Sequence, residues 1–151
     1  MTVLQPDKVI AVLEEKSTKG PARKELLQLT ADAVRDAGEP YTSVYLYMLH
    51  GEELVLEAFA GRETEHQKIQ VGHGVCGTAV AERRDQNVPD VRARENYIVC
   101  NRFTRSELVV LIRRGDQILG QIDVDSDVLD PFSQDEESAL KSVADALGRL
   151  L

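Results

Sequence analysis

Apolar residues recur along this chain with two different periods, and the change of period separates helices from strands. Residues 6–16, 26–37 and 140–150 carry an apolar or small residue every three or four positions. That spacing puts the apolar side chains on one face of a helix. The three segments are therefore predicted to be amphipathic helices, and Ser133 and Glu136 form a capping box that marks the start of the last one.

Between the helices the period shortens to two. Residues 41–50 are rich in β-branched and aromatic residues, and residues 54–59 follow after a short turn, which indicates an antiparallel hairpin. Residues 107–113 and 118–125 predict a second hairpin, joined by a turn at residues 114–116. Helices at both ends with hairpins between them predict an α+β fold, in which the helices pack on one face of an antiparallel sheet.

Composition narrows the class of protein. A chain of 151 residues can bury a proper core, and we expect a single domain over residues 1–151. The net charge of −8 repels phosphate backbones and anionic membranes, so neither nucleic acid nor a membrane is expected as a partner. No signal peptide and no zinc-type cysteine spacing is recognised. We therefore expect a cytoplasmic protein with reduced thiols and no bound metal.

The stretch between residues 60 and 106 is irregular and too long for a simple connection, which is typical of segments that carry a site. Gly72, Gly74 and Gly77 match the G-x-G-x-x-G spacing of dinucleotide-binding folds. We reject that function because the helix predicted to follow, through residues 79–83, is short and no βαβ series surrounds it. Two interpretations remain: a tight turn without a ligand, or a helix start whose backbone N–H groups receive a carboxylate or phosphate.

Three aspartates at alternate positions, Asp123, Asp125 and Asp127, end the second hairpin. Val128 and Gln134 stand where a calcium-binding loop needs glycine and glutamate, which excludes an EF-hand. On a strand, Asp123 and Asp125 point to the same face, and Glu107 on the neighbouring strand could join them. The pattern leaves two interpretations open: a solvated end of the sheet, or a carboxylate cage for an ammonium group.

The two cysteines lie in different surroundings. Cys100 belongs to a polar loop near Arg94, Arg102 and Arg105, and positive neighbours would lower the pKa of its thiol. Cys76 lies in an apolar segment and fits a small buried hydrophobic residue.

These fragments together resemble the GAF domain family, and within it the free methionine-(R)-sulfoxide reductases. The similar stretch runs from residue 71 to residue 126. It contains VGHGVCGTAVAERR, NVPDVRA, a cysteine at position 100 followed by SELVVLI, and ILGQIDVDS before Phe132 and Asp135. The resemblance implies a ligand pocket on the sheet face opposite the terminal helices, a homodimer formed through those helices, and no bound cofactor.

The resemblance also implies a role for each candidate residue. Cys100 is similar to the cysteine that attacks the sulfoxide sulfur. The resolving thiol would be Cys76 or an external thiol, with a thioredoxin-type donor as reductant. The acidic residues that match the substrate's ammonium site are Glu107, Asp123 and Asp125. The helix start at Gly74 and Val75 would receive the carboxylate of a small amino-acid-like ligand.

The sequence departs from the reductase pattern at three places. His66 stands where three-cysteine members have a further cysteine, Asn101 follows Cys100 in place of the common aspartate, and the chain has no tryptophan for the methyl group of the substrate. The chain is thus a two-cysteine variant. The alternative function is a non-catalytic GAF sensor that binds a small molecule or responds to a redox signal.

Overall fold

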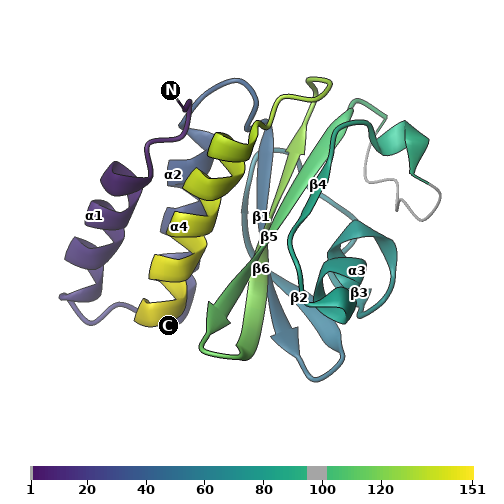
Figure 1. Ribbon diagram of the computed structural model, residues 1–151. Coiled ribbons are helices and arrows are strands. Elements are labelled where there is room, and N and C mark those ends of the chain that lie inside the picture. The colour runs from purple at the N-terminus through teal and green to yellow at the C-terminus, as the bar shows by residue number, and fades with distance from the viewer. Residues whose placement is uncertain (1, 95–101) are drawn as a thin grey trace.

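A computed structural model describes residues 2–94 and 102–151 and contains one six-stranded sheet with helices on both faces (Figure 1). The helices are α1 (Pro6–Ser17), α2 (Arg23–Arg35), α3 (Gly74–Glu82) and α4 (Gln134–Leu150). The strands are β1 (Ser43–His50), β2 (Glu53–Ala60), β3 (Lys68–Gln70), β4 (Gln86–Val88), β5 (Ser106–Arg114) and β6 (Gln117–Ser126). The predicted α+β class is confirmed.

The sheet has the strand order β3-β2-β1-β6-β5-β4, and every neighbouring pair is antiparallel. Both predicted hairpins, β1–β2 and β5–β6, are present, and β1 pairs with β6 to join them. The fully antiparallel sheet agrees with the rejection of a dinucleotide fold, which needs parallel strands.

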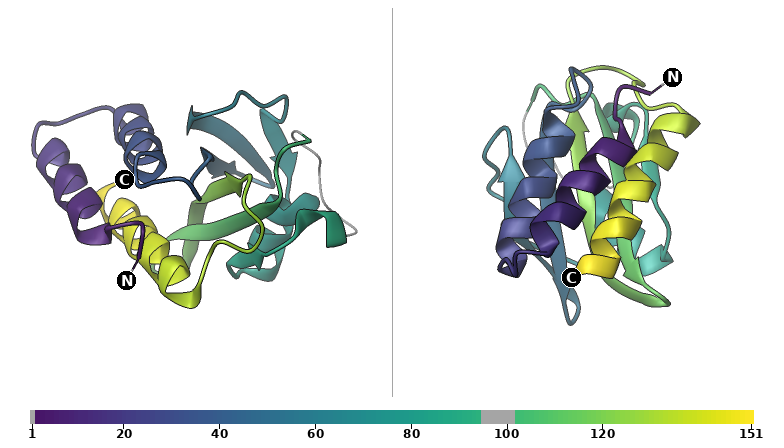
Figure 2. Two further views of the ribbon diagram at one scale, coloured as in Figure 1. Left: turned by 90° about the horizontal axis from the view of Figure 1, so that it is seen from above. Right: turned by 90° about the vertical axis from the view of Figure 1, so that its left-hand side faces the viewer.

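Two apolar cores lie on opposite faces of the sheet. On one face, α2 packs against β1 and β2, α4 packs against β5, and α1 covers both helices from outside (Figure 2). The alternate residues Leu46, Met48, Ile122 and Val124 contribute to this core. The other face carries α3 and a smaller core that includes Tyr45, Tyr47, Val109 and Leu111. The terminal helices therefore share one face, as predicted.

Two local predictions need correction. The helix predicted through residues 79–83 runs from Gly74 to Glu82, so Gly74 and Gly77 are helical, whereas Gly72 lies in the turn before the helix. The short edge strand β4 was not expected, because Val88 is its one apolar residue, which gives too little pattern to identify a strand. Among the described residues, no helix has the length and apolar character that a membrane span requires.

The predicted capping box at α4 is half correct. Ser133 Oγ accepts a hydrogen bond from the backbone N–H of Glu136 at 3.2 Å. The Glu136 carboxylate does not return to Ser133; it accepts hydrogen bonds from the backbone N–H groups of Val3 and Leu4 and from the hydroxyl of Tyr41. This buried carboxylate therefore joins the N-terminal segment, α4 and the segment before β1.

Candidate functional site

Strand β6 places two carboxylates on the sheet face that carries α3. Gln121, Asp123 and Asp125 alternate with Ile122 and Val124, which enter the opposite core. Asp123 and Asp125 are only 3% and 2% exposed. The interpretation of these aspartates as a solvated end of the sheet is therefore wrong.

The third carboxylate comes from β5. Glu107 is directly opposite Asp125 in the β5–β6 ladder, and Val109 is opposite Asp123. Glu107 is also buried, at 5% exposure. The expected grouping of Glu107 with Asp123 and Asp125 is confirmed, and the three define what we call the acidic cluster.

Helix α3 brings Cys76 to the acidic cluster. Its Sγ lies 3.7 Å from Oε2 of Glu107. The Gln121 amide Nε2 donates to the carbonyl oxygen of Cys76 at 3.0 Å, which ties the helix to β6. Cys76 is buried and free of any disulfide, as the apolar segment predicted, but its neighbours are carboxyl groups rather than only apolar side chains.

A glycine makes this close approach possible. A Cβ on Gly77 would meet the carbonyl oxygen of Gln70 and, at 2.9 Å, the backbone nitrogen of Gly72. The Gly72 N–H donates a hydrogen bond to the Gly77 carbonyl at 2.8 Å. This bond holds the loop before α3 against the first helical turn of α3. At the start of α3, Gly74 has φ of 64°, and both Gly74 and Val75 are buried.

Burial changes the protonation of the whole group. Loss of solvent and the neighbouring Asp125 raise the pKa of Asp123 to about 7. Burial, together with Asp123, raises the pKa of Glu107 well above its usual value, and burial with Glu107 does the same to the pKa of Asp125. Burial and the neighbouring acids also raise the pKa of the Cys76 thiol. At neutral pH the acidic cluster therefore retains protons that it can donate.

Several oxygens of this site have no hydrogen-bond donor among the described residues. They are Oδ1 of Asp123, Oδ2 of Asp125 and Oε1 of Gln121. Desolvated oxygens without donors are costly, so they favour a ligand that supplies N–H groups or positive charge. Cys76, Glu107 and Asp123 also offer ligand atoms that all lie within 4.8 Å of one another, close enough to share a metal ion.

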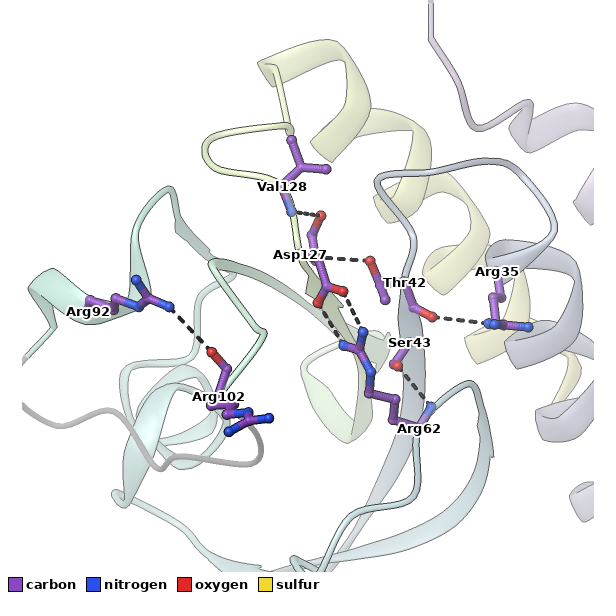
Figure 3. A network of polar contacts seen from close by, with 9 residues as sticks. Arg35, Thr42, Ser43, Arg62, Arg92, Arg102, Asp127 and Val128 are labelled. Atoms are coloured by element: carbon purple, nitrogen blue, oxygen red, sulfur yellow. Dashed lines mark hydrogen bonds and ion pairs between the residues drawn. The ribbon is translucent and has the colours of Figure 1, made fainter.

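Arg62 forms an ion pair with Asp127, two positions after Asp125 in the sequence, and we call it the rim ion pair (Figure 3). Arg62 makes two parallel hydrogen bonds to Asp127, of 2.7 and 2.5 Å, and its side chain lies over the ring of Phe103, 5.2 Å from the ring centroid. The Ser43 hydroxyl accepts a hydrogen bond from the Arg62 backbone N–H, and the Tyr45 hydroxyl donates to the Arg62 carbonyl. Asp127 therefore does not belong to the acidic cluster.

Sequence reasoning missed Gln121, Tyr45 and Arg62. Gln121 was detectable, because it precedes Asp123 and Asp125 at the same spacing of two. Tyr45 is opposite Asp123 in the β1–β6 ladder, which only the register reveals. Arg62 carries no sequence signal because its partner is 65 positions away.

Cys100, the predicted nucleophile, lies outside the described residues, as does Asn101. Of its predicted basic neighbours, Arg94 donates a hydrogen bond to Oε1 of Gln86 at 3.1 Å. The backbone carbonyl of Arg102 accepts one from Arg92 (Figure 3). The predicted effect of these arginines on the Cys100 thiol stays a prediction.

Comparisons with known proteins agree with the motifs. The model of the GAF domain matches residues 22–151. Free methionine-R-sulfoxide reductase of Escherichia coli is 36% identical over 105 residues, covering 70% of this chain and 63% of that protein, just under two thirds of its length. The structure of a type II free methionine-R-sulfoxide reductase from Thermoplasma acidophilum has a TM-score of 0.82 at 34% identity, covering 85% of this chain and 91% of that one.

The fold is shared with proteins of another kind. A Burkholderia vietnamiensis protein described as a GAF sensor has a TM-score of 0.81 at 28% identity, covering 95% of this chain and 93% of that one. Similarity of fold alone thus fits both an enzyme and a sensor. The match to the GAF model extends from before α2 to the end of α4 and includes every residue of the acidic cluster. The chain therefore belongs to the GAF domain family.

Proposed function

We propose that this protein reduces free methionine-(R)-sulfoxide, or a similar small sulfoxide, with Cys100 as nucleophile. The observation that carries the proposal is the acidic cluster. Three buried carboxyl groups lie beside a thiol, and two of their oxygens have no hydrogen-bond partner in the described part of the chain; this suits a ligand that brings an ammonium group and a polar S–O bond. The similarity to the reductases of E. coli and T. acidophilum supports the same substrate.

The acidic cluster would serve the substrate twice. Its ionised oxygens would accept hydrogen bonds from the ammonium group, in a setting where water cannot compete. A protonated carboxyl group would donate to the sulfoxide oxygen, and the raised pKa values of Asp123, Asp125 and Glu107 keep such a proton available near neutral pH. Protonation of that oxygen makes the sulfur more electrophilic.

The chemistry divides into three steps. The Cys100 thiol takes the oxygen from the sulfoxide, which releases methionine and leaves a sulfenic acid on Cys100. The Cys76 thiol then attacks that sulfenic sulfur, which forms a disulfide and releases water, and a thioredoxin-type dithiol reduces the disulfide by exchange. Because Cys76 is buried with a raised pKa, it stays protonated near neutral pH, which argues against Cys76 as the first nucleophile.

The test is a coupled assay with thioredoxin, thioredoxin reductase and NADPH. We expect NADPH oxidation with the R epimer of free methionine sulfoxide, little with the S epimer, and none for Cys100→Ser. Cys76→Ser should lose turnover with thioredoxin but keep one turnover per Cys100, seen as one equivalent of methionine. Full activity of Cys100→Ser would reject this nucleophile.

A sensor without turnover is the second candidate. The fold match to a GAF sensor and the absence of tryptophan support it. A sensor would bind methionine sulfoxide or methionine, raise its melting temperature with ligand concentration, and release no methionine in a single-turnover experiment. Ligand stabilisation without product would favour the sensor.

A further inference from the structure

We propose that the reduced protein binds one thiophilic divalent cation of the zinc class through Cys76 Sγ, Glu107 and Asp123. The three ligand atoms come from α3, β5 and β6, so the fold rather than a local sequence motif assembles the site. Spacing along the chain could not reveal it, because 31 positions separate Cys76 from Glu107. The proposal does not require that the protein be a reductase.

The distances suit tetrahedral coordination. With about 2.3 Å from zinc to sulfur and about 2.0 Å from zinc to oxygen, a tetrahedral angle separates the two ligand atoms by about 3.5 Å. Cys76 Sγ and Glu107 Oε2 are 3.7 Å apart. All three ligand atoms lie within 4.8 Å of one another, so small side-chain movements would bring Asp123 to the same ion.

A second observation points independently to a positive ligand. Oδ1 of Asp123, Oδ2 of Asp125 and Oε1 of Gln121 are buried, and residues 2–94 and 102–151 supply no donor to them. Gln121 is fully buried and its amide nitrogen is used by the Cys76 carbonyl, which places its unpartnered oxygen close to the same residue. A cation at this site would offset part of the cost of burying these oxygens.

The donor set selects the type of metal. One sulfur with two carboxylate oxygens favours zinc, cobalt or cadmium over magnesium and calcium, which prefer oxygen ligands alone. Three protein ligands leave a fourth position for water, as in zinc sites that exchange ligands. Asp127, the third member of the D-x-D-x-D run, is held at the rim by Arg62, so the run does not wrap a calcium ion.

Metal binding would compete with the proposed substrate. Coordination replaces the proton of the Cys76 thiol, which passes to solvent, and uses two of the three carboxyl groups proposed to hold the ammonium group. On the proposed function, the cation would therefore inhibit turnover and protect the Cys76 sulfur from oxidation. This consequence rests on that function, whereas the metal site itself does not.

Cobalt(II) is a suitable probe because thiolate ligation gives an ultraviolet charge-transfer band and tetrahedral coordination gives visible bands. Titration of the fully reduced protein should show one equivalent of bound cobalt, displaced by zinc. Cys76→Ser should lose the charge-transfer band, and Glu107→Gln should weaken binding at least tenfold. Cys100→Ser, which keeps the other thiol, and Asp116→Asn, an exposed carboxylate in the β5–β6 turn, should bind cobalt like the wild-type protein.

The outcomes separate the two proposals. The metal site is rejected if the reduced wild-type protein shows no thiolate band, or if Cys100→Ser removes the band and Cys76→Ser keeps it. Circular dichroism identifies a Cys76→Ser protein that fails to fold, and Glu107→Gln then decides the case. A protein that binds cobalt but releases no methionine supports the metal site and rejects the reductase. An active reductase without a thiolate band does the reverse.

Discussion

Glu107 and Asp125 lie directly opposite each other in the β5–β6 ladder, and both side chains are buried. Acidic residues at opposite ladder positions repel each other when they are ionised, and burial adds the cost of lost hydration. Apolar residues would stabilise this face better. The arrangement is therefore what a ligand site requires rather than what the fold requires.

The acidic cluster should make stability depend on pH. The pKa of Asp123 is raised from 3.8 to about 7 in the folded protein, so the folded state holds a proton that the unfolded state has lost between these pH values. Stability from this group is complete below pH 4 and falls as the pH rises through 7. At pH 8 we expect Asp123→Asn to unfold at a higher urea concentration than the wild-type protein. Because one pKa unit corresponds to about 1.4 kcal/mol, its free energy of unfolding should be higher by a few kcal/mol.

The advantage of Asp123→Asn should shrink toward pH 4, where both proteins carry a neutral side chain at this position. Asp116→Asn removes the same charge from an exposed turn and should follow the wild-type pH profile. Urea unfolding followed by circular dichroism from pH 4 to pH 8 measures both curves. A variant less stable than the wild-type protein at pH 8 would contradict the assignment of Asp123 as a destabilising buried acid.

Gly77→Ala should displace α3 from the sheet. The added methyl group would meet backbone atoms of Gln70 and Gly72, which cannot rotate away as a side chain can. Alanine ordinarily stabilises a helix by about 1 kcal/mol relative to glycine, so a loss of stability here must come from the clash. We expect a net loss of about 1–3 kcal/mol and weaker binding of any ligand that uses Cys76.

The matched control for this glycine is Ala81→Gly, at an exposed position of the same helix. It should cost about 1 kcal/mol through helix propensity alone and leave the ligand affinity unchanged. Thermal melts and calorimetric titration give the two quantities. A Gly77→Ala protein that is more stable than the wild type would show that α3 does not pack this closely.

Much of the sheet was predictable because its signal is local. The hairpins β1–β2 and β5–β6 have alternating patterns and clear turns. The alternation of Asp123 and Asp125 with Val124 was enough to predict that both carboxylates lie on the same face of the sheet. The short strand β4 was missed because only its pairing with β5 defines it. Its three residues contain too little pattern.

The site was predictable only in part, because its assembly depends on contacts between distant segments. Sequence periodicity could group Asp123 with Asp125, but could not decide whether they were solvated or buried. That outcome depends on α3, which covers this face of the sheet. The approach of Cys76 to Glu107 likewise follows from the packing of Gly77 against the turn before α3, and no local pattern encodes it.

The rim ion pair should affect the acidic cluster more than it affects stability. Both partners, Arg62 and Asp127, are more than a third exposed, so the pair contributes about 1 kcal/mol or less. The positive charge of Arg62 nevertheless lowers the pKa of Asp125 relative to what burial alone would give. Arg62→Met should therefore raise the pKa of Asp125 further and weaken the binding of a cationic ligand.

Calorimetric titration with methionine across pH 5 to 9 tests this effect. We expect the rise in affinity with pH to occur at higher pH in Arg62→Met than in the wild type, with little change in melting temperature. Arg84→Met removes a more exposed arginine, which pairs with Glu82 rather than with Asp127, and should leave the profile unchanged. Identical profiles for Arg62→Met and the wild type would contradict a role for Arg62 in the electrostatics of the site.

The carboxylate of Glu136 should be a larger contributor to stability than any ion pair on the surface. It accepts hydrogen bonds from Val3 N at 3.0 Å, Leu4 N at 2.7 Å and Tyr41 Oη at 2.8 Å, and it is only 5% exposed. Glutamine keeps the shape but offers one acceptor oxygen in place of two, so Glu136→Gln should cost about 2–3 kcal/mol.

Tyr41→Phe removes one of these three bonds and should cost about 1 kcal/mol. Because Tyr41 and Glu136 share a hydrogen bond, the double variant should lose less than the sum of the two single losses. Asp135→Asn removes a neighbouring exposed charge from the first turn of α4 and should cost under 1 kcal/mol, which separates the buried bonds from the helix dipole. Urea unfolding of the wild-type protein and the four variants measures the differences. Strict additivity of Tyr41→Phe and Glu136→Gln would show that the hydroxyl and the carboxylate act independently.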